Sequence, residues 1–153
     1  MPKNWRSWLD RTLEDLRILE QNRVEAHEKF DQFCEFIAEP AFETLADELK
    51  TRAVRCLWTR KKGLSLTLRT CFPGSRTADF EYIIRLSKDA VGLSLVLAVN
   101  GRRTKKSPFE AFEMAFLDGL DEARLIKLDK EILIRDVIDR YRDFKFGAST
   151  PAK

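Results

Sequence analysis

The sequence has little of the chemistry that most enzymes need. It contains one histidine, His27, and three cysteines without paired spacing, Cys34, Cys56 and Cys71. No Ser, Cys or Asp motif surrounds His27, so no imidazole-based dyad or triad is indicated, and structural zinc prefers four Cys or His ligands. None of the six glycines opens a helix after a strand, as a phosphate-binding loop requires. The sequence therefore predicts no catalytic residue, no metal site and no cofactor, and favours a non-enzymatic protein.

Long hydrophobic runs are also absent. The longest apolar stretch, Val91 to Val99, is far shorter than the roughly 20 residues that span a bilayer. The N-terminus runs directly into a charged amphipathic pattern instead of an apolar signal segment. An odd number of unpaired cysteines is typical of a reducing compartment. We therefore expect a cytoplasmic protein with free thiols and no membrane partner.

Charge is present in quantity and is unevenly distributed. Residues 1–50 hold seven basic and twelve acidic side chains, residues 51–106 hold thirteen basic and three acidic ones, and residues 107–153 hold eight and ten. Clustered charge of one sign attracts partners of the opposite sign over about 8 Å at physiological salt. The basic middle third is also the part with strand periodicity, which predicts a cationic sheet between acidic helices.

The first fifty residues show helical periodicity. Apolar residues recur at steps of three and four over residues 3–38, and the stripe continues beyond Pro40 to Leu49. Proline lacks an N–H and clashes with the preceding turn. Two readings remain open: one helix kinks at Pro40, or a new helix begins there with Pro40 at its first position. Both predict helix over 3–50.

Residues 53–99 alternate with a period of two, which predicts four strands. Their connections are short, so the sheet should be an antiparallel meander with one apolar face that helices cover. The alternating apolar positions are Val54, Cys56 and Trp58; Leu64, Leu66 and Leu68; Phe80, Tyr82, Ile84 and Leu86; and Leu93, Leu95, Leu97 and Val99.

The segment after the sheet carries a helix-start pattern. Ser107 can cap a backbone N–H, Pro108 suits the first helical position, and Glu110 can cap in return. The phenylalanines that follow also permit a fifth strand. We predict helix over 108–145, with a last helix after Asp129. The predicted fold is one α+β domain, residues 1–146, in which the N-terminal helix and the C-terminal helices pack on one face of a four-stranded antiparallel sheet. Residues 147–153 are predicted to be a disordered tail.

The basic residues of the sheet are candidates for polyanion or nucleic-acid binding, because lysine and arginine neutralise phosphates. One group lies at a predicted hairpin tip and another in the loop after the fourth strand, at opposite ends of the sheet by strand parity. Charged turns that keep the sheet soluble, or neutralisation by acidic residues of the first helix, would explain the same pattern. The candidates are Arg55, Arg60, Lys61, Lys62, Arg69, Arg85, Arg102, Arg103, Lys105 and Lys106.

The N-terminal end of the first helix is a candidate for self-association. Trp5, Trp8, Leu9 and Leu13 form an apolar strip. Two readings are open: the rest of the domain leaves the strip uncovered for a second copy, or the strip is buried within its own chain. Large exposed apolar patches mark partner surfaces. The sequence thus favours a cytoplasmic interaction module that forms a homodimer through its first helix, with polyanion binding by the basic face as the alternative.

Overall fold

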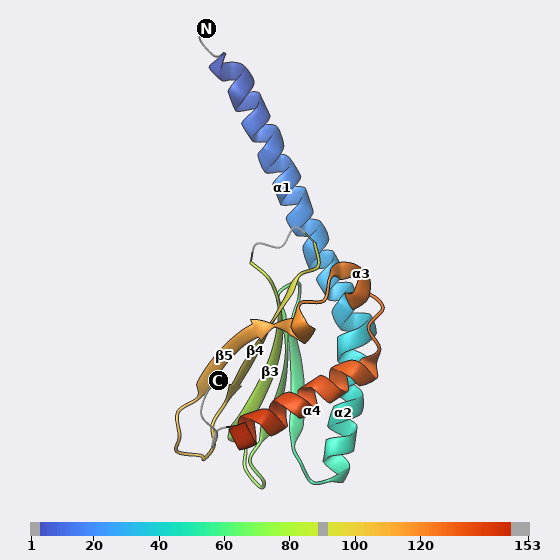
Figure 1. Cartoon of the computed structure of the whole chain (residues 1–153), viewed down its shortest axis with the longest axis vertical. Helices are drawn as coiled ribbons and strands as arrows, with labels where there is room; N and C mark the ends of the chain where they lie inside the picture. The colour runs from blue at the N-terminus through green and yellow to red at the C-terminus, as the bar shows by residue number, and fades with distance from the viewer. Residues whose placement is uncertain (1–3, 89–91, 148–153) are drawn as a thin grey trace.

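The computed structural model of the protein describes residues 4–88 and 92–147. Figure 1 shows an α+β arrangement in which α2 and α4 lie against one face of the sheet, while the N-terminal part of α1 extends far beyond the rest. The predicted tail, 147–153, lies outside the described residues except for Gly147. The elements in chain order are α1 (Trp5–Phe33), the π-helical segment η1 (Cys34–Ala38), α2 (Glu39–Thr51), β1 (Cys56–Lys61), β2 (Ser65–Cys71), β3 (Ala78–Leu86), β4 (Leu95–Gly101), β5 (Glu110–Ala115), the 3-10 turn η2 (Phe116–Asp118), α3 (Glu122–Leu125) and α4 (Lys130–Gly147).

The helix passes through Pro40 without stopping. Ala38 and Glu39 keep right-handed helical backbone angles, and the Glu39 N–H donates to the carbonyl of Cys34, five residues earlier. Proline cannot donate to the carbonyl four residues back, and its ring clashes with that carbonyl. The wider π turn just before Pro40 accommodates both constraints, as π-bulges do inside α-helices. The predicted end of the helix near Lys50 is confirmed, since α2 ends at Thr51.

The five strands form an antiparallel meander in the order β1-β2-β3-β4-β5. In the middle of the sheet, Leu68, Tyr82 and Val99 lie directly opposite one another on the covered face, and all three are buried. Phe30 of α1 and Phe42 of α2 are fully buried in the same core. Burying a side chain of this size contributes about 1.5–3 kcal/mol. The predicted alternation and the coverage of one face by helices are confirmed.

The prediction of four strands was wrong, because residues 110–115 form β5. This segment pairs with β4 from Val96↔Ala115 to Gly101↔Glu110. The helix-start pattern at Ser107 forms a turn instead of a helix. The N–H and the hydroxyl of Ser107 both form hydrogen bonds with the hydroxyl of Thr104. An open edge of β4 offers the segment a full set of backbone hydrogen bonds, and Phe112 and Met114 fit its alternation. The last helix does begin after Asp129, whose carboxylate accepts from the N–H of Glu131.

Candidate functional site

The projecting part of α1 is the candidate site, because its apolar side chains are exposed. The helix begins where the Asn4 side chain accepts from the N–H of Arg6. Trp5 is 60% exposed and Trp8 is 66% exposed, and Leu9 and Leu13 are exposed as well. The structure therefore brings the four residues predicted for self-association onto one helical segment that stands clear of the sheet (Figure 1). An exposed apolar patch of this kind is a feature of interaction surfaces.

The exposed apolar face continues the face that enters the core. Trp5, Leu19, Ala26 and Phe33 are separated by multiples of seven residues, which is close to two helical turns. A second set begins four residues after Trp5 and has the same spacing: Leu9, Leu16 and Phe30. Ala26, Phe30 and Phe33 are buried, and the two phenylalanines belong to the core that the sheet forms, whereas the apolar members before Arg23 are exposed. Thr12 and Arg23 interrupt the two sets. A largely apolar seven-residue repeat of this kind is the pattern of a helix that pairs with another helix. We call the exposed apolar residues on this side of the helix the arm stripe: the repeat members Trp5, Leu9, Leu16 and Leu19, and the flanking Trp8 and Leu13.

Leu16 and Leu19 are not among the residues predicted for self-association. The signal that identifies them is the seven-residue repeat, which links them to Trp5 and Leu9 and, further along, to the buried Phe30. Together the arm stripe spans residues 5–19, a helical length of about 21 Å.

The arm is anchored to the sheet by a contact between α1 and the β1–β2 turn. The carboxylate of Asp31 accepts a hydrogen bond of 2.6 Å from the N–H of Gly63, and Nδ1 of His27 lies 2.6 Å from the Gly63 carbonyl oxygen. A carbonyl oxygen only accepts, so Nδ1 of His27 carries the proton. His27 and Asp31 are one turn apart on α1, and they form hydrogen bonds with the peptide groups on both sides of Gly63. The single histidine thus has a structural partner in the turn.

A second contact joins α1 to α3. Nζ of Lys29 lies 2.9 Å from a carboxylate oxygen of Glu122, whose other oxygen accepts from the N–H of Leu93. The Leu93 hydrogen bond, followed by the bond from Lys29, lowers the pKa of Glu122. These contacts fix where α1 leaves the domain.

The predicted polyanion-binding residues fall into three groups: those paired with carboxylates of neighbouring strands, Arg60 on the side of the helices, and those at the ends of the sheet. Several cations of the strands have carboxylate partners: Arg69 lies 2.8 Å from Glu81, and Arg85 pairs with Glu113. Arg60 does not join the outer face of the sheet, because its position opposite Leu66 turns it toward the helices, where Glu39 lies 3.0 Å away.

The remaining candidates lie at the ends of the sheet. Lys61 and Lys62 are exposed at the β1–β2 turn, and Arg55 is exposed just before β1. In the loop between β4 and β5, Arg103, Lys105 and Lys106 are exposed, and Arg102 stacks 4.1 Å from the ring centre of Phe109. Antiparallel pairing of successive strands puts the two loops at opposite ends, as strand parity predicted.

The buried titratable groups are engaged inside the fold. Asp79, which is 2% exposed, accepts from Thr70 and from Tyr141 and lies 2.8 Å from Nζ of Lys145. Burial, and then the Asp79 charge, raise the pKa of Tyr141 to about 12. Burial is the largest cause that raises the pKa of the Cys34 thiol to about 12, and the thiol therefore stays protonated.

Within residues 4–88 and 92–147, no group of three or more His, Cys, Asp or Glu side chains is placed to hold a metal ion. Among the helices of those same residues, none has the length and apolar composition of a membrane span. No protein-family model, curated protein or solved structure matches the chain.

Proposed function

We propose that this protein is a non-enzymatic interaction module of the cytoplasm that pairs with a second copy of itself through the arm stripe. The observation that carries the proposal is the seven-residue repeat, which is buried at one end of α1 and exposed at the other. Fully burying an exposed side chain of Leu size contributes about 1.5–3 kcal/mol, and the stripe residues, which are 38–66% exposed, would gain about half of that when a partner covers them. Free thiols at Cys34, Cys56 and Cys71 fit a reducing compartment.

The charges beside the stripe favour an antiparallel pair. Arg6 and Glu20 each lie seven residues from Leu13 on the same flank of the helix. Two antiparallel helices that cross at Leu13 therefore bring Arg6 of each copy beside Glu20 of the other. A parallel pair would instead place Asp15 of each copy beside Glu20 of the other, which is repulsive. The antiparallel pair retains one like-charged contact, Asp15 with its own copy, against two attractive ones.

The oligomeric state tests the proposal. Light scattering coupled to gel filtration should give the mass of a dimer for the wild-type protein and of a monomer for Leu16→Asp. Ile18→Asp is the matched control: Ile18 is 43% exposed and Leu16 is 55% exposed, but Ile18 lies outside the repeat. A monomeric wild-type protein at all concentrations up to about 100 µM, a weak affinity by the standard of specific complexes, would refute the pairing, as would equal effects of the two variants.

The orientation has its own test. Glu20→Arg should weaken an antiparallel dimer, and adding Arg6→Glu should restore it, because the exchanged charges attract again. In a parallel dimer Glu20→Arg would strengthen the pair by replacing the repulsion with Asp15. Sedimentation velocity at low and high salt measures both effects, and a strengthened Glu20→Arg dimer would overturn the antiparallel assignment.

Polyanion binding is the second candidate, and the exposure of Lys61 and Lys62 at one end of the sheet and of Lys105 and Lys106 at the other supports it. The ion pairs of Arg60, Arg69 and Arg85 reduce the charge available between these ends. A mobility-shift titration with mixed oligonucleotides at two salt concentrations tests it. Affinity should fall with salt and with Lys61→Glu/Lys62→Glu; binding indifferent to both would exclude this function.

A further inference from the structure

A cavity of about 460 Å³ lies between α2, α4 and the covered face of the sheet. Leu49 of α2, Leu68 of β2, Phe80 of β3 and Val137 of α4 contribute to its walls. Pockets of about 300–1,000 Å³ with mainly apolar walls bury small-molecule ligands. The volume and the apolar lining of this cavity suit a ligand with an apolar body.

The hydroxyl groups of Thr70 and Tyr141 in the wall of the cavity are already used as donors. Thr70 and Tyr141 both line the cavity, and their hydroxyl groups donate to the two carboxylate oxygens of Asp79. A negatively charged head group at this wall would meet oxygen lone pairs and the neighbouring Asp79 charge. The polar end of a ligand must therefore lie at the mouth.

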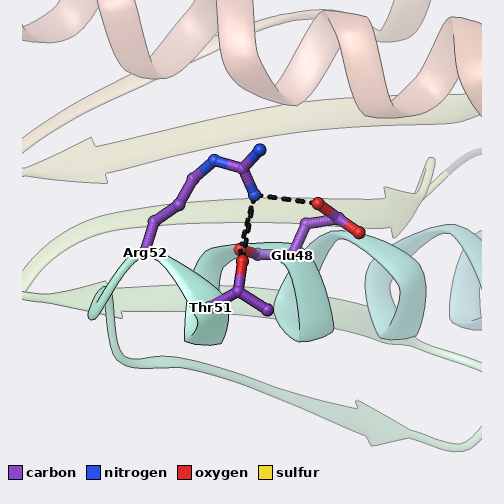
Figure 2. A network of polar contacts seen from close by, with 3 residues as sticks. All are labelled: Glu48, Thr51 and Arg52. Carbon is purple, nitrogen blue, oxygen red and sulfur yellow. Dashed lines mark hydrogen bonds and ion pairs between the residues drawn. The ribbon is translucent and has the colours of Figure 1, made fainter.

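A positively charged side chain with unused hydrogen-bond donors lies at the mouth of the cavity. Arg52 lines the cavity at the end of α2, and Figure 2 shows its guanidinium beside Glu48 and Thr51. All of its hydrogen bonds to the described residues come from Nη1, which donates to the Glu48 carbonyl and carboxylate and to the Thr51 hydroxyl. Nε and Nη2 form the other edge of the same planar group. Two parallel N–H donors on one edge of a guanidinium match the two oxygens of a carboxylate.

We propose that the cavity binds an amphiphile with a single alkyl chain and a carboxylate head, the chain lying between α2 and α4 and the head paired with Nε and Nη2 of Arg52. This site is separate from the arm stripe and does not depend on pairing. Each additional buried methylene contributes about 0.8 kcal/mol, so the affinity should rise about fourfold per methylene until the cavity is filled.

Calorimetric titration of the full chain with octanoate, decanoate and dodecanoate tests the site, each below the concentration at which it forms micelles. Arg52→Gln should weaken decanoate binding about two- to fivefold, as expected for an ion pair of a mostly exposed arginine, and should leave binding of the uncharged 1-decanol unchanged. Lys50→Gln is the matched control, because Lys50 is exposed on the same helix but does not line the cavity. Glu48→Gln should tighten decanoate binding, because it removes the competing carboxylate.

A variant that fills the cavity provides a second test. Val54→Phe adds a ring from the loop before β1, which lines the cavity, and should abolish binding of both decanoate and decanol while the protein keeps its wild-type circular dichroism. If this variant fails to fold, the chain-length series and Arg52→Gln decide alone. Absence of saturable binding, an affinity independent of chain length, or equal losses for Arg52→Gln and Lys50→Gln would overturn the proposal.

Discussion

Replacing Gly63 with alanine tests how the β1–β2 turn holds α1. Gly63 is buried with a φ of +73°, and a Cβ built there would lie 2.9 Å from Nδ1 of His27. An L-residue in this left-handed conformation costs about 1–2 kcal/mol. The added methyl also pushes His27 away and loses its bond to the Gly63 carbonyl, which contributes about 1 kcal/mol. Alanine also restricts the unfolded chain more than glycine does, and this effect offsets about 0.4–1 kcal/mol of the loss. The net loss should be about 2 kcal/mol.

Gly74 supplies the matched control. Its φ is +68°, but nothing lies within 4 Å of a Cβ built on it. Gly74→Ala therefore pays the conformational cost without the contact and should lose about 1 kcal/mol or less. Urea unfolding followed by circular dichroism measures both variants, with the midpoint shifting and the slope unchanged. Equal losses for the two variants would show that the contact between α1 and the turn contributes nothing, and would refute the reasoning.

Three further predictions concern the core. Asp79→Ala should cost about 3 kcal/mol in urea unfolding, because it leaves the ammonium of Lys145 without its buried partner; a loss no larger than that of the exposed Asp143→Ala would contradict it. Gly101→Ala should destabilise by about 1–3 kcal/mol, since its Cβ would lie 2.5 Å from the ring of Phe144, and an unchanged midpoint would show that α4 moves freely. Stability should fall as pH rises from about 9 to about 12, because the folded state holds protons on Cys34 and Tyr141 that the unfolded chain releases; unfolding free energies constant over this range would exclude the effect.

Much of the fold could be predicted because each local pattern has one dominant cause. The three- and four-residue steps before Pro40 predict helix and the alternation after Cys56 predicts strands, and the structure confirms both. Burial within the domain accounts for the alternation and for the helical steps from Ala26 onward, whereas the steps before Arg23 lie on an exposed face. The error at residues 110–115 arose where local signals conflicted. A capping pattern at Ser107 and helically spaced phenylalanines favoured helix, but the unpaired edge of β4 is a tertiary feature that no local pattern contains.

The site residues divide along the same line. Four residues of the arm stripe, Trp5, Trp8, Leu9 and Leu13, could be predicted because they are close in sequence and share one helix face. Leu16 and Leu19 were missed because the sequence alone does not show how far α1 projects from the domain. The cavity could not be, because its walls come from α2, β2, β3 and α4, which are adjacent only after folding. Arg52 carried no signal in the sequence for the same reason. The partner of Arg60 was equally hidden, since Glu39 reaches it only when α2 crosses the sheet.

The anchoring of α1 has a consequence for pairing. Ala26 and Phe30 in the core and Leu16 and Leu19 in the arm belong to one repeat on one continuous helix, so a rotation that turned the exposed face would also lift the buried face from the core. The grip on Gly63 opposes the same rotation. The face offered to a second copy is therefore held in one direction before contact, which reduces the entropy lost on association. Gly63→Ala should accordingly weaken the dimer as well as the fold, whereas Gly74→Ala should leave the dimerisation constant unchanged; sedimentation equilibrium that gave the same constant for both variants would show that the arm pairs independently of its anchor.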